Sequence, residues 1–64
     1  MANRLPELRK KRKMTQMDLA EKSGVCRSVI ARFETGKQGI SARNLERICK
    51  ALRCKMEDVL EEAS

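Results

Sequence analysis

The side chains best suited to chemistry in this 64-residue chain lie between Thr15 and Lys37. On a helix that begins near Cys26, a turn of about 100° per residue places four of them on one face: Arg27, Ser28, Ala31 and Arg32. Arginine can donate two parallel hydrogen bonds to guanine O6 and N7, and serine can bond to several bases. A face of arginine and small residues is therefore the pattern expected of a helix that enters DNA. An ordinary solvated helix face is the alternative that these residues alone leave open.

A preceding helix is predicted to hold this polar face in place. Thr15 is expected to cap that helix, and Asp18 three residues later completes a capping-box pair. Ser23-Gly24 is expected to end it, because glycine adopts the left-handed conformation that a short turn needs. Leu19 points to the core at helical spacing.

The helix that carries the polar face is expected from about Cys26 to Thr35, with Gly36 closing it. Its opposite face is apolar and should be buried: Val29, Ile30 and Phe33. Two helices joined by a short turn that contains glycine form a helix-turn-helix unit.

Three further helices are predicted around this unit. The first runs from an Asn3 cap to about Lys13, with Pro6 in its opening turn, and packs one edge on the core. The fourth is capped by Ser41 and carries a regular apolar stripe: Leu45, Ile48, Cys49 and Leu52. The fifth runs from Met56 to about Glu62 and is expected to bury three residues: Met56, Val59 and Leu60.

The length of the chain predicts one domain, residues 1–64, because a chain of this size buries only about 60% of its unfolded surface. No apolar run approaches the roughly 20 residues of a membrane span, and no apolar segment follows the charged N-terminus. We therefore expect a cytoplasmic protein, associated with the nucleoid when bound to DNA. One Phe and no Trp or Tyr leave few rings to stack on single-stranded bases, which disfavours RNA binding.

Charge is distributed unevenly along the chain. Fifteen Lys and Arg residues against nine Asp and Glu residues give a net charge of +6, which is typical of a polyanion binder. Residues 1–32 hold nine basic and three acidic groups, whereas residues 33–64 hold six of each. The densest basic run, Arg9 to Lys13, points in every direction on a helix. Most of its members are therefore expected to form a solvated face.

The residues for catalysis or metal binding are few. The chain has no His, and its three Cys residues, spaced by 23 and 5 positions, fit neither a zinc site nor a disulfide framework. Cys49 and Cys54 are expected to act as small buried apolar residues. Cys26, at a helix N-terminus among arginines, is a candidate redox-sensitive thiol. We expect no enzymatic activity, no metal, no cofactor and no small-molecule ligand.

Several residues agree in order and spacing with one known family: Thr15-Gln16, Leu19-Ala20, Gly24-Val25, Ile30, Glu34, Gly36 and Leu45-x-x-Ile48. They lie within the segments RLPELRKKRKMTQ, LAEKSGVCRSVIARFETGK, SARNLERICKAL and KMEDVL. On these residues the chain resembles the Cro and phage-repressor-like family, also called the XRE family, over nearly its whole length. The resemblance implies an all-α, compact five-helix bundle of the lambda-repressor-like DNA-binding type, with helices 2 and 3 as the helix-turn-helix.

The resemblance also implies roles for individual residues. The base readers carried over from the family are Arg27, Ser28 and Arg32. The phosphate contacts carried over are Gln16, Thr35, Lys37 and Arg43, of which Gln16 also braces the recognition helix. Arg9 and Glu34 occupy positions that often form an ion pair, which removes Arg9 from the DNA contacts. Cys26 departs from the usual Ser or Thr cap, so the start of helix 3 is expected to be weaker.

These inferences predict a sequence-specific regulator of transcription that binds double-stranded DNA, inserts helix 3 into the major groove and represses. One unit contacts few base pairs, so we expect a homodimer on a palindromic operator. Met56 and Leu60 are the candidates for the dimer interface. The alternative is a protein-interaction module of the same fold, such as an antitoxin or a phage regulator that acts mainly through a protein partner. A steep salt dependence of duplex binding would favour the DNA-binding regulator over the protein-interaction module.

Overall fold

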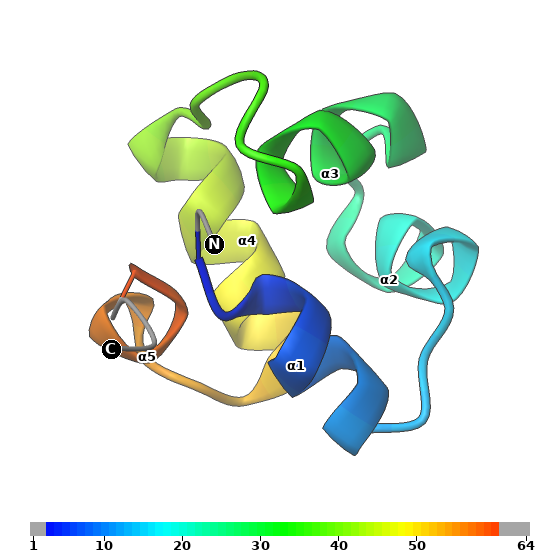
Figure 1. Ribbon diagram of the computed structural model, residues 1–64. Coiled ribbons are helices and arrows are strands. Elements are labelled where there is room, and N and C mark those ends of the chain that lie inside the picture. The colour runs from blue at the N-terminus through cyan, green and yellow to red at the C-terminus, as the bar shows by residue number, and fades with distance from the viewer. Residues whose placement is uncertain (1–2, 61–64) are drawn as a thin grey trace.

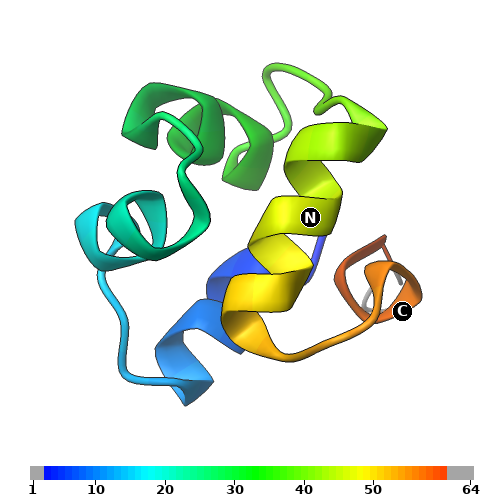
Figure 2. The same ribbon diagram turned by 180° about the vertical axis from the view of Figure 1, so that it is seen from behind.

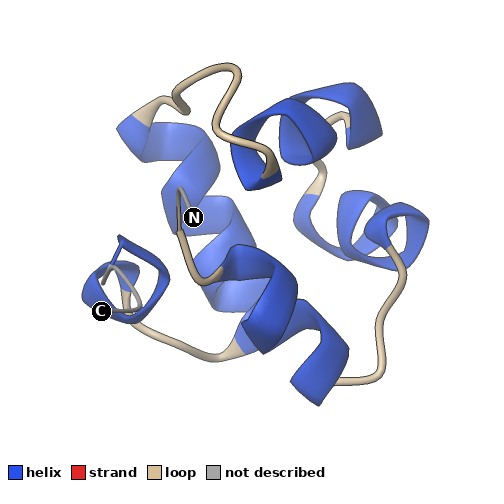
Figure 3. Ribbon diagram, in the orientation of Figure 1, coloured by secondary structure: helices blue, strands red, loops and turns tan. Residues whose placement is uncertain are grey.

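The computed structural model describes residues 3–60, and within this range it contains five helices and no strand (Figure 1, Figure 3). The helices are α1 (Leu5–Lys11), α2 (Gln16–Ser23), α3 (Arg27–Glu34), α4 (Ala42–Leu52) and α5 (Met56–Leu60). The predicted all-α, five-helix architecture is confirmed. None of the described helices is long and apolar enough to cross a membrane.

Helix α4 is the centre of the arrangement, and the views from both sides show the other helices around it (Figure 1, Figure 2). Helices α2 and α5 pack on α4, α3 packs on α2, and α1 packs on α5. The predicted apolar stripe of α4 is confirmed, because all four of its members are buried: Leu45, Ile48, Cys49 and Leu52. This stripe makes α4 the support against which the helix-turn-helix is held.

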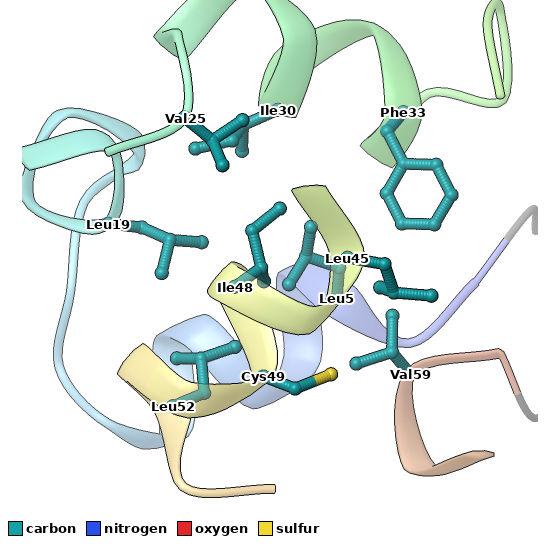
Figure 4. Packing of buried hydrophobic residues seen from close by; sticks show 10 residues of the cluster. All are labelled: Leu5, Leu19, Val25, Ile30, Phe33, Leu45, Ile48, Cys49, Leu52 and Val59. Atoms are coloured by element: carbon teal, nitrogen blue, oxygen red, sulfur yellow. The ribbon is translucent and has the colours of Figure 1, made fainter. Parts of the chain in front are cut away.

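The core draws at least one residue from every helix (Figure 4). Its members are Leu5, Leu19, Val25, Ile30, Phe33, Leu45, Ile48, Cys49, Leu52 and Val59. Ile30 and Phe33 are buried as predicted, and Val29 is partly buried against them. Burial of this apolar side fixes the rotation of α3 about its own axis, so its polar side must face outward.

Local capping sets the boundaries of α2 and α4. The Thr15 hydroxyl accepts a hydrogen bond from the Asp18 N–H at 3.0 Å, and the Asp18 carboxylate accepts one from the Thr15 N–H at 2.9 Å. Gly24 ends α2 with a φ of 75°. Ser41 caps α4 by accepting a hydrogen bond from the Asn44 N–H. All of these predicted boundaries are confirmed.

Helix α1 differs from its prediction at both ends. Asn3 does not occupy the N-cap position, which belongs to Arg4. The buried side-chain amide of Asn3 instead donates a 2.7 Å hydrogen bond to the Phe33 carbonyl and accepts one from the Leu5 N–H. The first of these bonds joins the segment before α1 to α3. The helix ends at Lys11 rather than Lys13, because Lys13 takes a φ of 58°, outside the helical range.

Helix α5 also needs a correction. Only Val59 reaches the core, whereas Met56 is 37% exposed and Leu60 is 51% exposed. The predicted burial of Met56 and Leu60 is therefore wrong, because this short helix packs on the core only through Val59. The predicted extension of this helix to Glu62 lies outside the described residues.

Candidate nucleic-acid interface

The outer side of α3 is polar and exposed. Arg27 and Ser28 open the helix, Arg32 lies in its last turn, and all three are exposed. Ala31 lies between them and is half-buried. The three predicted base readers therefore share one accessible surface.

The N-terminus of α3 is weakly capped. Cys26 occupies the N-cap position, but its side chain makes no capping hydrogen bond, and the first turn contains no acidic residue. A thiol is a poor acceptor compared with a hydroxyl, which explains the missing bond. The positive end of the helix dipole is thus not offset by any acidic side chain of its own first turn.

The C-terminal end of α3 is fixed by a buried ion pair. Arg9 Nε donates to Glu34 Oε2 at 2.9 Å, and Arg9 Nη2 donates to Glu34 Oε1 at 3.2 Å, so the contact is bidentate. The two side chains are only 11% and 6% exposed. Arg9 Nη1 also donates to the Met14 carbonyl at 2.8 Å. These bonds connect α3 to α1 and to the segment that leads into α2, and they hold Arg9 away from the outer side of α3.

Gln16 joins the same carboxylate from the first turn of α2. Its Nε2 donates to Glu34 Oε1 at 3.1 Å. An amide nitrogen carries two hydrogens, so this bond leaves a second donor on Gln16. The side chain can therefore brace α3 and still donate to another group.

The other predicted phosphate contacts lie on the connector after α3 and on the start of α4. Both segments are at the same end of the molecule as α3 (Figure 1, Figure 2). Lys37 is exposed directly after Gly36, whose φ is 77°, and Arg43 is exposed in the first turn of α4. The Thr35 hydroxyl is bonded back to α3, at 3.2 Å from the Ala31 carbonyl and 3.1 Å from that of Arg32.

Two contacts at this end of the molecule were missed by sequence reasoning. Arg32 Nη1 donates to Gln38 Oε1 at 3.4 Å, so the connector limits the directions that Arg32 can take. The Asn3 bond to the Phe33 carbonyl, described above, braces α3 from a third side. Neither pairing has a local sequence signal, because the partners meet only when the chain folds.

The three cysteines occupy different environments. Burial raises the pKa of Cys49 to about 12, and burial also raises the pKa of Cys54. Both thiols are therefore protonated at neutral pH and behave as small apolar residues, whereas Cys26 is exposed. Among residues 3–60, no group of three or more potential ligand side chains is placed to hold a metal ion.

Two stacked helices, a glycine turn and an exposed arginine-bearing face define a helix-turn-helix DNA-binding domain. Residues 4–62 match the family model of the Cro/C1-type HTH DNA-binding domain. The chain belongs to this family, which is a DNA-binding class and not an enzyme class.

Relatives of the chain carry names that agree with this assignment. YgzD of Bacillus subtilis, named as an uncharacterized HTH-type transcriptional regulator, is 42% identical over 64 residues, which cover 97% of both chains. YozG of the same organism, similarly named, is 40% identical over 55 residues, or 84% of this chain and 66% of YozG. The immunity repressor protein of Bacillus phage phi105 is 34% identical over 62 residues, or 97% of this chain and 43% of the repressor. The chain thus spans about two-thirds of YozG and less than half of the phage protein.

Proposed function

We propose that the chain is the operator-binding part of a transcriptional repressor and that α3 enters the major groove of double-stranded DNA. One observation carries the proposal: α3 has a buried apolar side and an exposed polar side, and Glu34 at its end is bonded to α1 and α2. A rigidly held reading helix is what sequence-specific contact requires. The name of the phage relative supports repression as the outcome.

Base contacts are assigned to Arg27, Ser28 and Arg32. Arg32 follows Arg27 by five residues, which is roughly 7.5 Å along the helix axis. Because this separation exceeds the spacing of about 3.4 Å between successive bases of one strand, the two arginines are assigned to different base pairs. Each bidentate contact to guanine contributes about 1–3 kcal/mol of discrimination.

Phosphate contacts are assigned to Gln16, Lys37, Arg43 and Thr35. Gln16 has its second amide hydrogen for a phosphate oxygen while the first remains on Glu34. Lys37 and Arg43 supply exposed cations at the same end of the molecule. Thr35 is the weakest of the four, because its hydroxyl must leave the Ala31 and Arg32 carbonyls before it can donate to a phosphate.

The test is a selection of bound sequences from a pool of random duplexes, followed by affinity measurements on the selected site. Arg27→Ala and Arg32→Ala should each relax specificity at one position and cost about 1–3 kcal/mol. Lys37→Gln should weaken all duplexes alike and reduce the salt slope by about 1. Lys50→Gln is the control, since Lys50 is an exposed cation on α4 that takes no part in the proposed contact. A selection that yields no preferred sequence would instead favour a protein-interaction module.

We further propose that the repressor binds a palindromic operator as a homodimer. Met56 and Leu60 are exposed apolar residues on α5, and apolar exposure of this kind is reduced when two copies meet. Leu60→Gln should lower the dimer fraction in sedimentation velocity. Met17→Gln is a matched control, because Met17 is 53% exposed but lies on α2. Equal effects of the two changes, or none from Leu60→Gln, would refute this interface.

A further inference from the structure

The basic run at the end of α1 has no role in the proposed DNA contact. Lys11, Arg12 and Lys13 are exposed, and Arg53 at the end of α4 is exposed beside Lys11 and Arg12. In both views of the ribbon, the C-terminal ends of α1 and α4 lie at the opposite end of the molecule from α3 (Figure 1, Figure 2). The molecule measures 30 Å along its longest axis. These cations therefore lie apart from the surface assigned to DNA.

The same end of the molecule is hollowed. One hollow of about 320 Å³ lies between α1, the end of α4 and α5, and among its walls are Lys11, Arg12 and Arg53. A second hollow of about 240 Å³ adjoins it, since both are lined by Arg12, Leu52 and Arg53, and it adds Lys22. Arg12 stands between the two hollows, and its Nε donates to the Leu52 carbonyl at 3.0 Å. That bond fixes the guanidinium while its remaining N–H groups stay as donors. We name this pair of hollows the basic groove.

The basic groove combines cations with apolar walls. Half-buried Leu8 lines the first hollow, and half-buried Met14 and Ala51 line the second, whereas Leu52 is 1% exposed and offers almost no surface. One carboxylate, Asp58, also lines the first hollow. A nucleic-acid backbone carries no large apolar side chain to place against these residues, whereas a peptide can carry one.

We propose that the basic groove docks an acidic segment of a partner protein that also carries apolar side chains. Its carboxylates would pair with the cations of the groove, and its apolar side chains would enter the hollows. This inference goes beyond the proposed function, because the groove lies at the opposite end of the molecule from α3. The domain would then bind operator and partner at opposite ends.

The variant that tests the groove is Lys11→Gln combined with Arg53→Gly. Both side chains are exposed, and Arg53 has a φ of 55°, a conformation that glycine adopts without strain, so the fold should persist. The matched control is Arg47→Gln combined with Lys50→Gln. It removes the same two charges from exposed positions of α4 that do not line the groove.

The probe is a short fluorescein-labelled peptide of glutamate and leucine, with binding followed by fluorescence anisotropy on the chain without DNA. A second peptide has serine in place of each leucine, and a non-operator duplex serves as the competing polyanion. We expect the first peptide to bind, the groove variant to weaken it about tenfold, and the control to leave it nearly unchanged. We also expect the serine peptide to bind more weakly.

Three outcomes would overturn the proposal. They are no binding of the first peptide, equal losses in the groove variant and the control, and equal binding of the two peptides. A groove variant that loses duplex affinity but not peptide affinity would assign the groove to nucleic acid instead. Because the peptide assay uses no operator, its failure is distinguishable from failure of the proposed DNA-binding function.

Discussion

Replacement of Glu34 by alanine gives the sharpest test of how α3 is held. The change removes one carboxylate and with it three hydrogen bonds, two from Arg9 and one from Gln16. Arg9 keeps its bond to the Met14 carbonyl, so its guanidinium stays in a site where only 11% of the side chain is exposed. The variant therefore leaves a charge that is largely buried and has lost its counter-ion.

The magnitude follows from that geometry. Breaking a buried ion pair by removing one partner costs about 3–5 kcal/mol, against about 0–1 kcal/mol for an exposed pair. Residual exposure of Arg9 lets some water reach it, so we expect a loss near the lower limit, about 3 kcal/mol. A domain of this size has a total stability of roughly 3–10 kcal/mol. Glu34→Ala should then lower the Tm by roughly 12 °C or more.

The assay is urea and thermal unfolding followed by circular dichroism. Glu46→Ala is the matched control, because Glu46 forms an exposed pair with Lys50 at 3.7 Å and should change stability by less than about 1 kcal/mol. The double variant Arg9→Met, Glu34→Leu should regain much of the loss, since it removes both charges from the buried site. A loss below about 1 kcal/mol for Glu34→Ala, or no recovery in the double variant, would refute the reasoning.

Three further changes test local features of the fold. Cys26→Ser adds a capping hydroxyl at the start of α3 and should raise stability by about 0.5–1 kcal/mol in thermal unfolding; an unchanged Tm would count against the weak cap. Arg53→Gly relieves a residue with a φ of 55° and should stabilise by roughly 0.5–1 kcal/mol in urea melts, whereas a loss would contradict the strain. The Thr15 hydrogen bonds hold the pKa of Asp18 below its usual value, so its contribution to stability is present at neutral pH and lost as the pH falls through that lowered pKa. Asp18→Asn should therefore reduce stability at neutral pH, and the difference from the parent chain should disappear in strong acid; a constant difference would exclude this linkage.

The sequence predicts most of the fold where the signals are local. Thr15 and Asp18 form a capping box between residues three positions apart, and Gly24 takes a conformation that few other residues adopt. The burial of the α4 stripe follows from helical periodicity alone, and so does the inner face of α3. In each case the residues that decide the structure lie within one or two turns of each other.

Predictions failed where the deciding contact joins distant residues. Asn3 is a residue type that often caps helices, but its side-chain amide donates to the Phe33 carbonyl thirty positions away. The exposure of Met56 and Leu60 depends on how α5 approaches α4 and α1, which no short pattern encodes. The hydrogen bond from Arg12 to the Leu52 carbonyl, forty positions later, likewise has no local pattern that could have predicted it. The roles of the candidate DNA contacts stay predictions until duplex binding is measured.

Glu34 joins the stability of the domain to its proposed function. An acidic residue in the last turn of a helix is unfavourable by itself, because the helix dipole is negative at that end. Arg9 offsets this cost, and Gln16 donates to the same carboxylate, which would orient its amide for the proposed phosphate contact. A change at Glu34 should therefore weaken both folding and operator binding, whereas a change at Lys37 should weaken binding alone. The comparison of these two variants would separate the residues that hold α3 from those proposed only to contact DNA.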